Sequence, residues 1–297
     1  MFDLRYHVAS LAAVFFALVI GILVGVALAS HGLGNTERNR LEENLRRANS
    51  RGDALQAQLQ ALGESSTAEH SYVDKTYAQV MAGRLNRAKI AVLFVGPVQG
   101  DIRSAIARTL ADAGAGDPLR MRAVTVPIDP AAIDRRLAKR PFLAAYAGPD
   151  QLHQLGHALG QELTAGTDTP LWNALETLIV EQKSGPAKQR ADGIVVVRTA
   201  KSQSGPTAEF LQGLYSGIRD VGVPAVGVEL SGAEVSAMKR LQKAGLSTVD
   251  NLDTPVGRLA LAILLSNPSV KGDFGTKQTA RDGVLPEVVA PVTTTGG

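Results

Sequence analysis

The feature that most constrains this chain is an uncharged stretch close to its N-terminus. From Val8 to Ala29 the sequence contains no charged side chain, and Ser10 is the only polar one. These 22 residues would form a helix of roughly 33 Å, at a rise of about 1.5 Å per residue, which matches the thickness of a bilayer's hydrocarbon core. We therefore predict a transmembrane helix over residues 8–30, behind an N-terminal tail of residues 1–7.

A cleaved signal sequence is the competing interpretation of this stretch. Ala27-Leu28-Ala29 before Ser30 matches an A-x-A cleavage site, but the hydrophobic region of a signal peptide is only about 7–15 residues long. The length therefore favours a retained anchor in contact with membrane lipid.

The orientation of this helix in the membrane is a separate question. Arg5 is the only basic residue of the tail, and several arginines follow the helix. A count of positive charges places the C-terminal side in the cytoplasm, whereas the form of an export signal favours a single-pass protein of the cell membrane with an extracytoplasmic domain. We adopt the second orientation.

Small residues recur at every fourth position of this helix. They are Ala9, Ala13, Ala17, Gly21, Gly25 and Ala29. Such a ridge, which includes a G-x-x-x-G pattern, lets two helix backbones approach closely within a membrane. Glycine is common in membrane helices, so chance recurrence is the alternative. We predict that the helix associates with a second copy of itself.

A polar helix with regularly spaced leucines follows a predicted hinge at residues 31–35. Over residues 36–64 the apolar positions are separated by 4, 3, 7, 4 and 3 residues, which fits a heptad repeat. They are Leu41, Leu45, Ala48, Leu55, Leu59 and Leu62. We predict a parallel homodimeric coiled coil through this seam, weakened where Gly52 replaces a core residue; a solvated helix lying on its own domain is the alternative. Residues 65–87 are expected to form a linker or further helix.

Composition excludes several classes of function. The formal net charge is only +3, and aromatic residues make up 4% of the chain, so few stacking platforms exist for nucleic acid. The chain has no cysteine, which rules out disulfides, thiolate metal ligands and cysteine nucleophiles.

Residues 88–266 alternate short apolar runs with amphipathic segments. Strands are predicted at 89–96, 119–127, 193–200, 224–230 and 247–251, and helices at 101–114, 210–222, 233–245 and 255–265, with 130–183 largely helical. This alternation indicates an α/β fold with a mainly parallel sheet and helices on both faces, a Rossmann-like three-layer arrangement. Asp150 is a plausible cap for a helix over 151–163, and Thr254 or Asp253 for the last helix. The tail, residues 267–297, has no periodicity and is expected to be largely irregular.

Ligands of such folds bind beyond the carboxyl ends of the strands, but the loops there complete no catalytic signature. The loop at Gly96 lacks a G-x-G-x-x-G pattern, and Pro97 removes an N–H that a phosphate cradle would use. Asp250 and Asp253 are possible paired carboxylates, although a strand-end turn and a helix cap are the favoured roles. We therefore predict no catalytic residue, no cofactor and no enzymatic activity.

His153 and His157 are the strongest metal-binding candidates. They are four residues apart, so they lie on one side of a helix, beside the leucine stripe expected to face the core. Two ligands are too few for a tight site without a third, and ordinary surface histidines are the competing interpretation. The methionines are isolated and form no cluster suited to Cu(I).

Two segments together resemble a known family. They are Arg5-x-His7-x-x-Ser10-Leu11-x-Ala13-Val14-Phe15-x-Ala17-Leu18-x-x-Gly21-x-x-x-Gly25 and Val249-Asp250-x-x-Asp253-x-x-x-Gly257-Arg258. With the leucine heptads and the α/β pattern between them, they resemble the actinobacterial MctB family, also called SteB. The resemblance implies copper efflux or copper homeostasis at the cell envelope. It also implies an association with cell division, as a membrane coiled-coil partner of SteA in the control of peptidoglycan hydrolysis.

Three functions thus remain open from the sequence. Copper homeostasis follows from the resemblance, and a membrane-anchored coiled-coil scaffold with a SteA-like partner is the alternative. One membrane helix cannot enclose a pore, so conduction of copper would need several copies or a partner. An α/β enzyme or small-ligand sensor rests on fold analogy alone.

Overall fold

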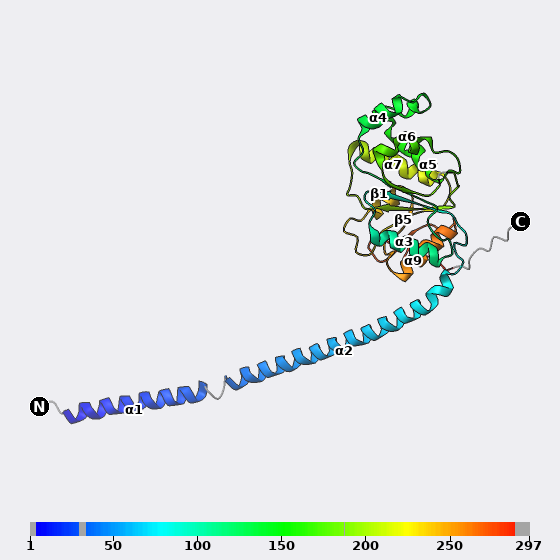
Figure 1. The fold of residues 1–297 in the computed structure, drawn as a ribbon. Helices are drawn as coiled ribbons and strands as arrows, with labels where there is room; N and C mark the ends of the chain where they lie inside the picture. The colour runs from blue at the N-terminus through cyan, green and yellow to red at the C-terminus, as the bar shows by residue number, and fades with distance from the viewer. Residues whose placement is uncertain (1–3, 30–33, 187, 289–297) are drawn as a thin grey trace. The chain divides into compact units, whose positions relative to one another are not determined.

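The computed structural model describes residues 4–29, 34–186 and 188–288. The chain divides into two compact units, residues 1–71 and 72–297 (Figure 1). The first unit contains α1 (Leu4–Leu28) and most of α2 (Gly34–Met81). Most of the predicted hinge, residues 31–35, lies outside the described residues, as does the end of the C-terminal tail.

The helices of the first unit leave their apolar side chains uncovered within that unit. His7–Leu28 is long and apolar enough to cross a membrane, and none of it is buried. Gly21 and Gly25 have no atom within 4 Å of an added Cβ, so the small-residue ridge is open. α2 is a continuous helix of 48 residues, without interruption at Gly52. Its seam leucines are 57–69% exposed.

The second unit is built around a seven-stranded sheet in the order β3-β2-β1-β4-β5-β6-β7. All neighbouring strands are parallel except β2 and β3. The strands are β1 (Ile90–Val95), β2 (Arg120–Val124), β3 (Val180–Ser184), β4 (Gly193–Arg198), β5 (Ala225–Val228), β6 (Ser247–Val249) and β7 (Asp273–Phe274). The predicted mainly parallel α/β sheet is confirmed.

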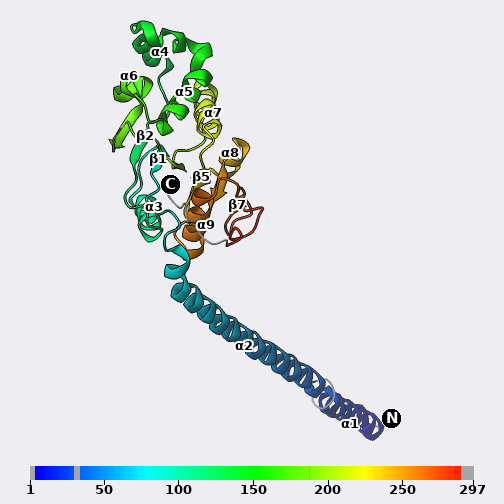
Figure 2. The same ribbon diagram turned by 90° about the vertical axis from the view of Figure 1, so that its right-hand side faces the viewer.

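Helices cover both faces of the sheet, because both faces of its central strands are apolar. The helices of this unit are α3 (Gly100–Asp112), α4 (Pro130–Ala138), α5 (Leu152–Thr164), α6 (Pro170–Ile179), α7 (Gly205–Asp220), α8 (Met238–Lys243) and α9 (Pro255–Ser266), with 3₁₀ turns η2 (Pro141–Tyr146) and η3 (Pro149–Gln151). Side chains alternate along a strand, so Leu93 of β1 packs in the core under α4–α8, and Phe94 in the core under α3 and α9. Figures 1 and 2 show these two helical layers.

Four details of the predicted helices were wrong. Residues 180–184 are strand rather than helix, because they hydrogen-bond along the otherwise open edge of β2, a partner that local periodicity does not reveal. Asp150 lies within η3 and Gln151 takes the N-cap position of α5. Helix α7 starts five residues earlier than expected, with Pro206 in its first turn. Helix α8 starts only at Met238, because the Glu229 carboxylate binds the Ala237 N–H in the preceding turn.

The segment after residue 267 contributes to the sheet. Its backbone is mostly irregular, but Asp273–Phe274 pairs with β6 as strand β7. Asp273 is buried and accepts hydrogen bonds from Thr248 and Arg281. A two-residue strand has no detectable periodicity, so the sequence carried no signal for it.

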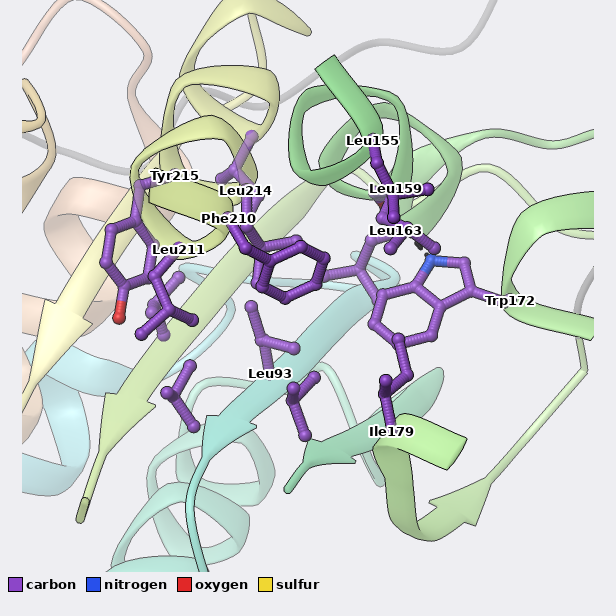
Figure 3. Packing of buried hydrophobic residues seen from close by; sticks show 14 of the residues in the cluster. Leu93, Leu155, Leu159, Leu163, Trp172, Ile179, Phe210, Leu211, Leu214 and Tyr215 are labelled. Carbon is purple, nitrogen blue, oxygen red and sulfur yellow. Dashed lines mark hydrogen bonds between the residues drawn. The ribbon is translucent and has the colours of Figure 1, made fainter. Parts of the chain in front are cut away.

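Helices α5 and α7 pack with their backbones in direct contact through four glycines. An added Cβ on Gly156 of α5 would lie 2.1 Å from the Phe210 carbonyl oxygen, and one on Gly213 of α7 would lie 2.0 Å from the His153 carbonyl oxygen. Gly160 and Gly217, one turn further along, make equivalent approaches. Each helix thus carries a G-x-x-x-G pattern facing the other. Beneath them, Trp172 donates from its indole nitrogen to the Leu159 carbonyl oxygen at 3.0 Å, and its ring packs with Phe210 and Leu163 (Figure 3).

We predict that Gly213→Ala destabilises the domain severely, because the new methyl group overlaps backbone atoms that cannot move independently. The expected loss in the free energy of unfolding is about 3 kcal/mol, the upper range for overpacking. Urea denaturation followed by fluorescence of Trp172, the single tryptophan, measures it. Gly100→Ala in α3 is the matched control, because an added Cβ there meets nothing within 4 Å; equal destabilisation by both variants would contradict the packing argument.

Candidate functional site

The crevice where doubly wound folds bind nucleotides is filled by the protein itself. The strand order reverses between β1 and β4, and ligands of such folds bind beyond the strand ends at that point. Here Gly96 has a φ of +102°, and an added Cβ would lie 2.7 Å from the Ala200 nitrogen. The Thr199 hydroxyl donates to the Pro97 carbonyl oxygen at 2.8 Å. The two loops therefore close against each other and leave no phosphate cradle between them.

The carboxylates at the ends of β5 and β6 are occupied by structural hydrogen bonds. Glu229, 3% exposed, accepts from Lys277 Nζ at 2.7 Å and from Ser236 Oγ at 2.9 Å. Asp250 accepts from the Thr276 N–H at 2.8 Å and the Thr279 hydroxyl at 3.3 Å. Both carboxylates hold the segment after β7 against the sheet. Asp250 thus hydrogen-bonds to a loop that is distant in the sequence, rather than within the turn that follows β6.

Asp253 and Thr254 have separate roles at the start of α9. The Thr254 hydroxyl accepts from the Gly257 N–H at 3.0 Å and is the cap. Asp253 instead accepts from the backbone N–H and hydroxyl of Ser231, at 2.7 and 2.9 Å. Gly257 is required by space, since an added Cβ would lie 2.1 Å from the Asn251 carbonyl oxygen. The predicted cap role of Asp253 was therefore wrong, and that of Thr254 is confirmed.

A cavity of about 670 Å³ lies between α5, α7 and α8, beside the carboxyl end of β4. Its volume is in the range of small-molecule sites, about 300–1,000 Å³. It is lined by His153, His157, Arg198, Gln203, Ala208, Leu211, Gln212, Tyr215, Ser216, Arg219, Asp220, Arg240, Lys243 and Ala244. The cavity is the best candidate for a functional site in the described part of the chain, because it joins a concave surface to clustered charge.

Both predicted histidines line this cavity. His153 is exposed and His157 is half-buried; His157 Nε2 lies 3.1 Å from Asp220 Oδ2. Asp220 also accepts from Arg219 Nε at 2.8 Å, and the hydrogen bonds from Arg219 and then His157 lower the pKa of Asp220. Within residues 4–29, 34–186 and 188–288, no three or more His, Cys, Asp or Glu side chains are grouped so that they could hold a metal ion. Metal binding by His153 and His157 stays a prediction.

Cationic side chains surround the histidines, and the sequence analysis did not identify them. Arg198, 7% exposed, is the last residue of β4 and donates from Nη2 to the Lys201 carbonyl oxygen at 3.0 Å. Arg240 on α8 donates to the Ser202 hydroxyl, and Lys243 follows one turn later. Arg198 ends a buried strand, just before a loop at the sheet edge where ligands of such folds bind. That position is the sequence signal that would have indicated this cavity.

The C-terminal end of α2 is fastened to the α/β domain by a second polar cluster. The Tyr77 hydroxyl donates to Asp112 at 2.8 Å, and Arg258 Nε donates to the same hydroxyl at 3.1 Å. The Arg258 guanidinium also lies 5.2 Å from the centre of the Tyr77 ring, a cation–π distance. Burial, and then the hydrogen bond to Asp112, raise the pKa of Tyr77 to about 12.

A model of the family described as "Copper transport outer membrane protein, MctB" matches residues 1–285. The chain belongs to the MctB family. The match extends over α1, α2 and the whole sheet, including the segment after β7 that Glu229 and Asp250 hold. A search of the curated proteins finds no match. The MctB description concerns transport rather than catalysis, and its membrane location agrees with the apolar helix His7–Leu28.

We predict that Arg258→Ala loosens the attachment of α2, because it removes a hydrogen bond and a cation–π contact. The expected loss in unfolding free energy is about 1–2 kcal/mol, measured by urea denaturation. Arg108→Ala, at an exposed position on α3, should change the free energy of unfolding by less than about 0.5 kcal/mol.

We predict that the stability of the domain falls at high pH because of Tyr77. Folding raises the pKa of Tyr77, so the contribution of this residue to the free energy of unfolding is complete below pH 10 and is lost as the pH rises through about 12. An alkaline transition unchanged in Tyr77→Phe would contradict this assignment.

Proposed function

We propose that this protein is a dimeric, single-pass envelope protein that contributes to copper homeostasis, with its α/β domain outside the cytoplasm. In this proposal α1 is the membrane anchor, α2 is the dimerising stalk and the α/β domain is a binding module. The observation that carries the dimer is the exposed leucine seam of α2, which follows the apolar helix α1 in the sequence.

The seam supports a dimer because its exposure is costly in water. Five leucines at heptad positions are 57–69% exposed in the single chain. Complete burial of one leucine contributes about 1.5–3 kcal/mol, and pairing with an identical helix buries all of them at once. The open ridge with Gly21 and Gly25 supports a second contact between the same two chains within the membrane.

The copper assignment rests on the family, and the cavity histidines are where we would place a weak metal contact. Neutral imidazole binds copper well, and His157 has a carboxylate neighbour in Asp220 at 3.1 Å. One anchor helix per chain cannot form a pore. In this proposal any passage of copper therefore requires several copies or a separate channel.

A membrane-anchored scaffold of the SteB type is the second candidate. It is favoured by the same exposed seam and by the absence, in the described ranges, of a three-ligand metal cluster. In this case a SteA-like partner would bind the protein, and any role in copper homeostasis would be indirect. Binding of copper by the purified chain separates the two candidates.

We predict that a cysteine placed in the seam cross-links two copies. The chain has no native cysteine, so Leu62→Cys introduces a single thiol at a core position, and a parallel in-register dimer brings the two thiols together. Oxidation in membranes should give a covalent dimer on non-reducing gels. Ala57→Cys, on the opposite side of the heptad, is the matched control. Equal cross-linking at both positions, or none at Leu62, would reject the parallel coiled coil.

We predict that the full chain in detergent binds Cu²⁺ with an affinity tighter than about micromolar, and that replacing His153 and His157 by alanine weakens it at least tenfold. Isothermal titration measures both affinities. His70→Ala, an exposed histidine on α2, should leave binding unchanged. If no variant differs from the parent chain, the cavity histidines do not bind copper, and the scaffold function is preferred.

A further inference from the structure

The cavity between α5, α7 and α8 carries far more positive than negative charge. Its described lining includes four cationic side chains, Arg198, Arg219, Arg240 and Lys243, and one carboxylate, Asp220. With both histidines neutral the net charge of the lining is therefore +3. Asp220 is already bound to Arg219 and His157. Charges of one sign lining a concave, low-dielectric wall concentrate the opposite charge there.

Two of the three arginines that line the cavity, Arg198 and Arg240, are held in place without being neutralised by a carboxylate. Arg198 is 7% exposed and donates from Nε and Nη2 to two backbone carbonyl oxygens, those of Ala200 and Lys201. Arg240 donates to a neutral hydroxyl, that of Ser202. These contacts orient the guanidinium groups while leaving their full charge available. An oriented guanidinium is the group best suited to two parallel hydrogen bonds with a phosphate or carboxylate.

The Tyr215 hydroxyl is a further donor at the base of the cavity. Tyr215 is 3% exposed, and its hydroxyl oxygen lies beside the Arg198 guanidinium. Among the described residues, no group accepts a hydrogen bond from its O–H. Figure 3 shows its ring at the end of the buried cluster away from Trp172. Burial raises the pKa of Tyr215 despite the nearby charge of Arg198, so the group stays a neutral O–H. A buried O–H without an acceptor is costly, and an oxygen atom of a bound ligand would accept its hydrogen bond.

We propose that this cavity binds a small organic phosphate, with its phosphoryl group among the basic side chains and the Tyr215 hydroxyl. Leu211, Ala208 and Ala244 supply an apolar wall for the organic part of the ligand. The charge disfavours a bare cation, which the four positive groups repel. This inference is independent of the dimer proposal, because it uses other residues than the leucine seam. It competes with the metal contact proposed at His153 and His157, because these histidines line the same cavity.

The proposal is tested on the full chain in detergent by titration with inorganic phosphate, glycerol 3-phosphate and ATP, without magnesium and at constant ionic strength. The three probes share a phosphate group and differ in the organic part attached to it. The order of their affinities therefore distinguishes among a free phosphate, a lipid-like headgroup and a nucleotide. Lys243→Gln and Arg240→Gln should each weaken the tightest probe at least fivefold, whereas Lys243→Arg should restore binding. Lys239→Gln, also on α8 but outside the lining of this cavity, is the matched control.

Tyr215→Phe provides a test that a purely structural role would not pass. The substitution removes the O–H that has no acceptor and keeps the ring. The unliganded protein should therefore melt at the same or a higher temperature, whereas its affinity for the phosphate probe should fall at least threefold. Failure of all three probes to bind would overturn the proposal. Equal losses in Lys239→Gln and Lys243→Gln would also overturn it, because they indicate general surface attraction, and so would tighter binding of citrate than of every phosphate.

Discussion

The backbone contact between α5 and α7 is the interaction on which the candidate site depends. Gly156 and Gly160 on one helix face Gly213 and Gly217 on the other, so close that no side chain fits between them. The same approach places His157 of α5 within 3.1 Å of Asp220 of α7, and α8 closes the cavity beside them. A larger separation of α5 and α7 would move apart the side chains that line the cavity. The close packing of these two helices therefore determines which groups can act together on a ligand there.

Structural hydrogen bonds occupy several of the loops at the carboxyl edge of the sheet. The loops after β1 and β4 close on each other, and the carboxylates after β5 and β6 hold the C-terminal segment. On the face of the sheet that α3 and α9 cover, Tyr77 and Arg258 hold the C-terminal end of α2 to the domain. The second sequence segment shared with the family is explained by these ties. Asp250 holds the segment after β7, Gly257 permits a close approach, and Arg258 attaches the C-terminal end of α2.

Much of the architecture was predictable because it depends on local patterns. The apolar helix and the buried strands are continuous apolar runs, and the leucine heptads repeat a fixed spacing, so neighbouring residues reveal all three. The α/β fold followed from the alternation of apolar runs with amphipathic segments in residues 88–266. The strands β3 and β7 were missed because they exist only through pairing with β2 and β6. The histidine pair was identified from its spacing, whereas Arg198, Arg240 and Tyr215 come from distant segments and share no local pattern. The G-x-x-x-G patterns of α5 and α7 were visible but meant little without knowing that they face each other.

The sequence by itself determined the alternation of strands and helices, the apolar N-terminal helix and the leucine seam, since each can be recognised from consecutive residues. Tertiary structure alone decided that Asp250 and Asp253 serve as ties, that the usual nucleotide crevice is closed, and that four cationic side chains surround one cavity. The physical reason is that hydrogen bonding and charge clustering depend on distances between residues far apart in the chain. Those distances exist only once the strand order and the approach of α5 to α7 have been established.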